Sequence, residues 1–226
     1  MISPKKSYIE NLPSAGTLRK EYKTKFQDIY VNKSMTKTGL GDTDEEDAIL
    51  GMGKFIPGKI YTYEYDPLYK DSLSYYDKRP IILVNEVYKA KNGNNIVRGI
   101  NLNFLPEEIK VATLQQFYKT FEGEIKKSEE AAYGGGIFMG IGKIVSFFRD
   151  WVQVLSMFGA SAGVGYQFAY RSYIIDRVKN LRYMEYQHWE MIPFLNPEEI
   201  NGASVSTIYK EYWSTQSDLI KGPKKK

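Results

Sequence analysis

Three runs of β-branched and aromatic residues lie between positions 60 and 106, and turn-forming residues separate them. The runs span 60–65, 81–87 and 96–105. Such residues favour strands, and Asn92-Gly93 is a strong hairpin signal, because Asn and Gly adopt positive φ at little cost. The second run is almost wholly apolar, which predicts burial on both faces. The sequence therefore predicts three neighbouring antiparallel strands that curl into a small barrel.

Helical patterns precede and follow these strands. Apolar residues recur at helical spacing in 17–31, and Pro106 with two acids after it favours a helix over about 107–127. A basic helix is predicted for 171–182 and a fourth strand for 183–195, which would close the barrel. We therefore expect an α+β fold: a small SH3-like β-barrel or curled antiparallel sheet with inserted and flanking helices.

Composition divides the chain into a central domain and two arms. Residues 1–54 are expected to form an N-terminal arm with a short helix and an acidic loop at 42–47. That loop lacks the glycine that a calcium-binding loop needs at its sixth position, so we interpret it as solvated. A single domain is expected over 55–213, with a helical insertion at about 106–182 and a last helix after Pro197. Residues 214–226 are expected to be a basic tail.

The sequence offers little material for catalysis. It has no Cys, which excludes thiolate zinc sites and Cys nucleophiles and fits a reducing compartment. The single histidine, His188, lies beside Trp189 in an aromatic stretch, where a structural role is commoner than a catalytic one. The glycines at 134–142 lack the GK[ST] ending of a phosphate-binding loop. We expect no enzyme activity, no cofactor and no metal site.

Basic residues with tyrosines between them suggest a nucleic-acid contact. The net charge of +4 is too small to imply nucleic acid by itself. The predicted helix at 171–182 and the C-terminal tail nevertheless concentrate lysine and arginine. The candidate contact residues are Arg171, Arg177, Lys179, Arg182, Lys224, Lys225 and Lys226.

The chain contains 19 Tyr, a residue that suits surfaces buried against a partner. The candidate partner-interface residues are Tyr61, Tyr63, Tyr65, Tyr75, Tyr76, Gly159 and Gly163. The last two form a GxxxG pair inside an uncharged stretch, 151–170, that is long enough for a membrane span. Polar residues in this stretch favour buried helices or an interface loop, and membrane interaction is retained as an alternative.

Three separated blocks stand out along the chain. They are Tyr75-Tyr76-Asp77-Lys78-Arg79-Pro80, the segment 99–106 with sequence GINLNFLP, and Trp189-Glu190 with Pro193-Phe194-Leu195. Together these blocks resemble a family of proteins of contractile-tailed bacteriophages, including relatives of the T-even group. The chain departs from the family pattern in having Phe104 where Tyr is usual.

The resemblance implies a virion or virion-assembly protein that is made in the host cytoplasm and has no catalytic residues to transfer. We expect a structural component of the tail, baseplate or neck that binds other virion proteins and copies of itself. The first alternative is a DNA-binding protein in genome packaging or DNA-end protection. The second is a membrane-interacting protein that uses the Gly-rich apolar segment.

Overall fold

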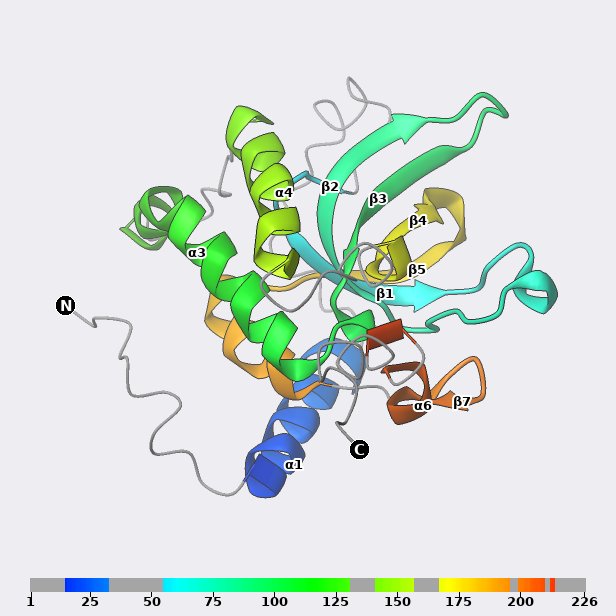
Figure 1. The fold of residues 1–226 in the computed structure, drawn as a ribbon, viewed down its shortest axis with the longest axis horizontal. Coiled ribbons are helices and arrows are strands. Elements are labelled where there is room, and N and C mark those ends of the chain that lie inside the picture. The colour runs from blue at the N-terminus through cyan, green and yellow to red at the C-terminus, as the bar shows by residue number, and fades with distance from the viewer. Residues whose placement is uncertain are drawn as a thin grey trace, which may run out of the picture.

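A five-stranded antiparallel sheet forms the centre of the computed structural model, with helices α3 (Glu107–Glu130) and α4 (Ile141–Ser156) on one side of it (Figure 1). The structure describes residues 15–32, 55–130, 141–156, 167–195, 199–209 and 212–213. Helices and an antiparallel sheet occur together, which confirms the expected α+β fold.

The first three strands confirm the predicted sheet. They are β1 (Ile60–Tyr65), β2 (Ile81–Lys89) and β3 (Asn95–Asn101), and adjacent ones pair antiparallel. The turn between β2 and β3 places Gly93 at a φ of 87°, where a side chain would be strained. The third strand is shorter than predicted, because a 3-10 turn, η4 (Leu102–Phe104), follows it.

The predicted basic helix at 171–182 is wrong. This part of the chain forms strand β4 (Tyr170–Ile174), a 3-10 turn η5 (Ile175–Arg177) and strand β5 (Val178–Tyr183). Aromatic and β-branched residues favour strands here, and Tyr173 and Ile175 are buried. Asn180 adopts a φ of 52° and shifts the register of β5 against β1, which breaks the alternation that would have marked a strand.

The predicted fourth strand at 183–195 is also wrong, apart from its first residue. Residues Tyr186–Phe194 form the 3-10 helix η6, which buries Trp189, Met191, Ile192 and Pro193. The indole Nε1–H of Trp189 donates to the Met184 carbonyl oxygen at 3.0 Å. Tertiary packing of the large apolar side chains therefore outweighs their apparent alternation.

The sheet is strongly curled but not closed. Its strand order is β4-β3-β2-β1-β5, so β4 and β5 lie at opposite edges. Only the three residues of η5 join these edges, and three residues span at most about 10 Å. In the described residues β4 pairs only with β3, and β5 only with β1. The curled-sheet alternative is confirmed, and the closing of a barrel by 183–195 does not occur.

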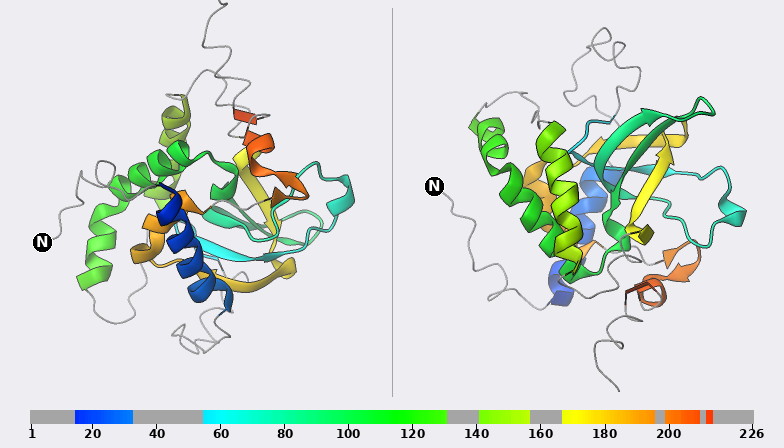
Figure 2. Two further views of the ribbon diagram at one scale, coloured as in Figure 1. Left: turned by 90° about the horizontal axis from the view of Figure 1, so that it is seen from below. Right: turned by 45° about the horizontal axis from the view of Figure 1, so that its top comes forward.

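The curl gives the sheet two apolar cores. The inner one contains Phe55, Tyr61, Tyr63, Ile82, Val84, Val97, Tyr173 and Ile175. The larger one lies between the other face of the sheet and the helices, which include α3 (Glu107–Glu130) and α4 (Ile141–Ser156) (Figure 2). Trp151 of α4 donates its indole N–H to the Thr113 hydroxyl of α3 at 2.8 Å. Two helices thus lie between β3 and β4, and the first of them is the helix predicted over about 107–127.

The N-terminal helix α1 (Ala15–Phe26) continues as one π-helical segment, η2 (Gln27–Asn32), and confirms the helix predicted over 17–31. It packs on η6, where Tyr22 stacks on Phe194 with ring centroids 5.3 Å apart. The Tyr30 hydroxyl and His188 Nδ1 lie 2.5 Å apart in a hydrogen bond. Burial lowers the pKa of His188, and its hydrogen bond with Tyr30 joins η2 to η6.

The last helix begins later than predicted. A small hairpin, β6 (Glu199–Ile200) and β7 (Ala203–Ser204), precedes α6 (Val205–Tyr209). A further 3-10 turn, η3 (Lys70–Ser72), lies between β1 and β2. The acidic loop at 42–47, the glycines at 134–136, Gly159, Gly163 and the tail at 214–226 lie outside the described residues. No helix within the described ranges is long and apolar enough to cross a membrane.

Candidate nucleic-acid interface

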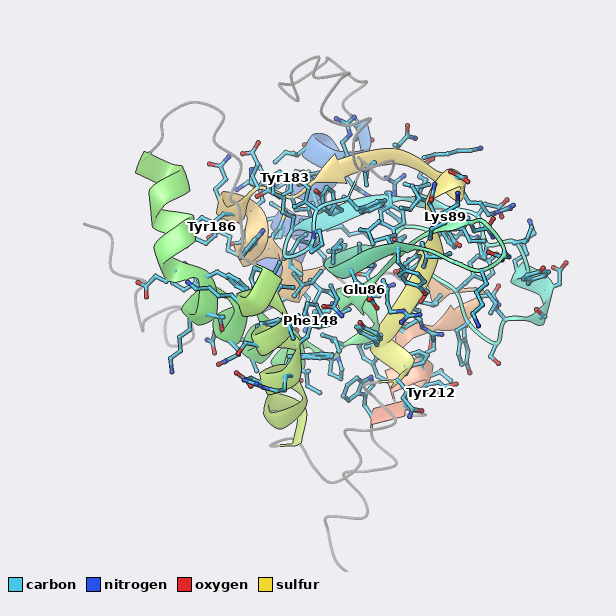
Figure 3. All side chains as sticks on the ribbon, turned by 90° about the horizontal axis from the view of Figure 1, so that it is seen from above. Glu86, Lys89, Phe148, Tyr183, Tyr186 and Tyr212 are labelled. Atoms are coloured by element: carbon cyan, nitrogen blue, oxygen red, sulfur yellow. The ribbon has the colours of Figure 1, made fainter. Side chains whose placement is uncertain are left out.

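The end of the sheet that points away from α3 carries exposed lysines. Lys89 and Lys91 lie at the tip of the β2–β3 hairpin, and no acidic residue occurs between Val87 and Ile96. Figure 3 shows Lys89 at the end of the molecule opposite α3. Neither lysine has an ion pair in the part of the chain that the structure describes. The hairpin tip is therefore a small, uncompensated positive surface.

The turn η5 lies beside this hairpin. Lys89 pairs with Asn95 in the β2–β3 register, and Ile96 pairs with Ile174 at the end of β4. Because neighbouring strands are about 4.8 Å apart, the start of η5 lies two strand spacings, about 10 Å, from the Lys89 backbone. The hairpin tip and η5 together form what we call the sheet-end surface: Lys89, Lys91, Arg177 and Lys179.

The two cations contributed by η5 and β5 differ in their surroundings. Arg177 donates from Nε to the Asp66 carbonyl oxygen, and its guanidinium lies 3.3 Å from the Asp66 carboxylate. Lys179 is exposed, and the described residues give it no ion pair. Arg177 thus fixes the turn against the β1–β2 connection, while Lys179 remains accessible to an anion.

The structure does not bring all the predicted contact residues onto one face. Arg177 and Lys179 lie on the sheet-end surface. Arg182 is partly buried on β5 opposite Thr62, and Arg171 is partly buried on β4 opposite Gly99. Lys224, Lys225 and Lys226 lie outside the described residues. Two of the four described candidates are therefore held within the sheet edges and not on its exposed end.

Two of the tyrosines that were candidates for a partner interface lie in the interior of the fold. Tyr61 and Tyr63 are 4% and 0% exposed, so a partner that meets the folded surface does not reach them. Tyr65 is partly buried, and its hydroxyl accepts a hydrogen bond from the Ile174 amide at 3.2 Å. Tyr75 packs edge-on against Phe168, and Tyr76 is partly exposed. The alternation of tyrosine along β1 thus reflects the inner core.

Residues of two of the three sequence blocks meet in one buried polar cluster. Asp77 accepts hydrogen bonds from the Arg79 amide at 2.9 Å, from Asn101 Nδ2 at 3.1 Å and from Asn103 Nδ2 at 2.7 Å. Burial raises the pKa of Asp77, and these hydrogen bonds to the carboxylate counteract the rise. Asn101 also donates to the Tyr173 hydroxyl at 2.8 Å. The cluster joins β3 and β4 to the segment before β2 and has a scaffolding role.

Sequence reasoning missed Lys89 and Lys91, although the signal was present. Two lysines flank an Asn-Gly turn with no acidic residue nearby, and hairpin tips lie at the surface. Among the described residues, no three His, Asp or Glu side chains gather in a way that could hold a metal ion.

The described part of the chain thus has an antiparallel α+β fold with a small basic surface at one end of its sheet. The family model described as Phage T4 terminal DNA protecting protein matches residues 46–132, which is less than half of the 226 residues. The matched range contains β1, β2, β3 and the whole of α3. Searches of curated proteins and of solved structures found no match.

The match supports a relationship with a protein family of T4-like phages, as the sequence blocks implied. Two of those blocks, around Asp77 and Asn101, lie within the matched range, and the block at Trp189 lies outside it. The match gives no support to the expected role in a tail, baseplate or neck. It favours the alternative that involves DNA ends.

Proposed function

We propose that this chain is a phage protein that binds the ends of linear double-stranded DNA and shields them from nucleases. The similarity of residues 46–132 to the phage T4 terminal DNA protecting family carries this proposal. The proposed action is binding without a chemical step, in the virion and on DNA that leaves it. Contacts with other virion proteins and with further copies of the chain remain predictions.

The charge distribution of the sheet-end surface supports this proposal. Lysines that approach DNA displace counterions from the phosphates, and this release drives binding at low salt. Lys89, Lys91 and Lys179 have no carboxylate partner within the described residues, so they need not break an ion pair first. Asp176 is exposed beside them and limits the local excess of positive charge. A local contact of a few phosphates fits this surface better than a long track of duplex.

Exonuclease digestion of linear duplex tests the proposal. We expect the wild-type chain to slow digestion from the ends at low salt and to lose this effect as salt rises. The double variant Lys89→Glu/Lys91→Glu should protect less, and its binding should depend less on salt, with a slope of log affinity against log salt smaller by about 2.

The matched control is Lys20→Glu/Lys119→Glu, which makes the same charge change at exposed lysines on α1 and α3. This control should protect DNA like the wild type. If the wild type leaves digestion unchanged, the proposed function is wrong. If both double variants protect equally well, the function stands but the sheet-end surface is not the contact.

A further inference from the structure

The guanidinium of Arg171 lies between aromatic rings, at a site separate from the sheet-end surface. The centre of its guanidinium lies 4.9 Å from the ring centroid of Phe104 and 4.9 Å from that of Phe168. Phe168 in turn stacks on Tyr212, with centroids 3.8 Å apart and ring planes 6° apart. Tyr212 is labelled in Figure 3. Two rings from different parts of the chain therefore fix the position of one guanidinium.

The described residues leave this guanidinium without a hydrogen-bond or ion-pair partner. A guanidinium carries five N–H donors, and the Nε–H of Arg171 is buried with no acceptor. Its guanidinium contacts the rings of Phe104 and Phe168 and interacts electrostatically with Tyr173 and Tyr212, while its backbone pairs with Gly99. By contrast, Arg79, Arg98 and Arg177 each pair with a carboxylate. Arg171 is thus an arginine held in place with its donors unused.

A partly buried guanidinium without hydrogen-bond acceptors destabilises the fold unless an anion binds to it. Removing a cation from water without a counter-charge is unfavourable, and burial lowers the pKa of Arg171, although an arginine stays charged at neutral pH. Stacking on the two rings recovers part of this cost. It also holds the planar group in one orientation, so an incoming anion need not order a flexible side chain.

We propose that Arg171 binds a phosphate group of DNA through the N–H donors of its two terminal guanidinium nitrogens, since its Nε–H is buried; this inference rests on the proposed function. Guanidinium groups match phosphate oxygens in geometry and charge and bind them with paired hydrogen bonds. Arg171 lies three residues before Ile174 on β4, so about 10 Å of strand separates it from η5. The phosphate is either the monoester at the 5′ end or a diester within the strand.

Binding measurements with three DNA molecules distinguish these sources. They are a blunt linear duplex with 5′-phosphate ends, the same duplex with 5′-hydroxyl ends, and a covalently closed circle. Each is titrated with the wild type, Arg171→Gln, Arg171→Lys and the control Arg149→Gln. Arg149 is an exposed arginine on α4, so the control removes the same charge from another surface. Arg171→Lys keeps the charge but loses the planar fork, and it serves as the informative variant if Arg171→Gln does not fold.

For a terminal phosphate, the wild type should prefer 5′-phosphate ends by about tenfold, and both Arg171 variants should lose this preference. For an internal phosphate, the variants should weaken binding to all three molecules by a similar factor, while Arg149→Gln binds like the wild type. The inference is overturned if folded Arg171 variants bind every DNA as the wild type does. If the wild type binds none of the three, the proposed function fails together with it.

Discussion

Asp77 carries a buried carboxylate that neutral N–H groups hold in place. It is 4% exposed, and three of its hydrogen bonds come from the Arg79 backbone and the amides of Asn101 and Asn103. Lys110 adds a favourable electrostatic interaction from α3. One side chain thus connects the segment before β2 with the end of β3 and the start of the helical insertion.

Replacing Asp77 by Asn should destabilise the fold. The new side-chain N–H2 group would face the amide donors of Asn101 or Asn103, which leaves buried donors without an acceptor. We expect a loss of about 2 kcal/mol in the free energy of unfolding, measured by urea denaturation. The control Asp71→Asn lies on exposed η3 and should change stability by less than about 0.5 kcal/mol. Equal effects of the two substitutions would contradict the role assigned to Asp77.

At the scale of elements, β2 and β3 approach closely at Gly99. A Cβ atom at this position would lie 2.1 Å from the backbone oxygen of Leu83, and no side-chain rotation can relieve that contact. The register between the two strands shifts between Val84 and Glu86, immediately beyond this point. The glycine therefore permits the irregular pairing that bends the hairpin.

Gly99→Ala should consequently cost about 3 kcal/mol or more in thermal or urea unfolding. Gly123→Ala on α3 is the matched control, because nothing lies within 4 Å of its added Cβ. Alanine favours helices over glycine, so this control should gain about 0.5–1 kcal/mol. A mild effect at Gly99 would contradict the close approach of β2 and β3 at this position.

The elements that sequence reasoning predicted correctly are those with local signals. Asn92-Gly93 marks the hairpin, and Pro106 with two acids after it marks the start of α3; these signals act within a few residues. The segment 170–183 has no such signal. Its strands are defined by pairing with β3 and β1, which lie far away in the sequence, and Asn180 disrupts the alternation that would have shown them.

The candidate site was predicted only in part for a related reason. Arg177 and Lys179 were singled out for their positive charge, and both lie on the sheet-end surface. Their neighbours Lys89 and Lys91 belong to a different sequence region, and only the strand register brings that region beside η5. Sequence spacing also could not show that Arg171 faces two aromatic rings, since Phe104 belongs to η4.

At the scale of the whole molecule, the amine of Lys110 is buried between α3 and η6, and burial disfavours its charged form. Lys110 is 0% exposed, and its Nζ donates to the Leu195 carbonyl oxygen at 2.7 Å, which links α3 to the end of η6. Burial lowers its pKa to about 7, although Glu107 and Asp77 act in the opposite direction. The unfolded chain keeps this amine protonated up to about pH 10.4.

Stability should therefore rise with pH between about 7 and 10. In this window the unfolded chain binds a proton that the folded chain does not, so the free energy of unfolding increases by up to about 1.4 kcal/mol per pH unit. Above about pH 10 the tyrosines of the unfolded chain lose their protons, whereas burial raises the pKa of Tyr183 in the folded chain to about 12. This difference lowers the free energy of unfolding as the pH rises further. Urea midpoints at pH 7, 8 and 9 measure the rise, and Lys110→Met should flatten it. If the urea midpoints of the wild type and of Lys110→Met rise equally with pH, Lys110 is not the source of the rise.

The order of the strands also determines when the fold can form. Tyr61 of β1 pairs with Tyr183 of β5, and Gly99 of β3 pairs with Arg171 of β4. Both outer strands therefore pair with strands that come much earlier in the sequence. Pairings between such distant residues close large loops and slow folding. During synthesis, β1 and β3 leave the ribosome long before their partners and expose unpaired backbone edges, which invite association between chains. The range related to the phage family contains β1, β2 and β3 without either outer strand, so its sheet depends on the later part of the chain for completion.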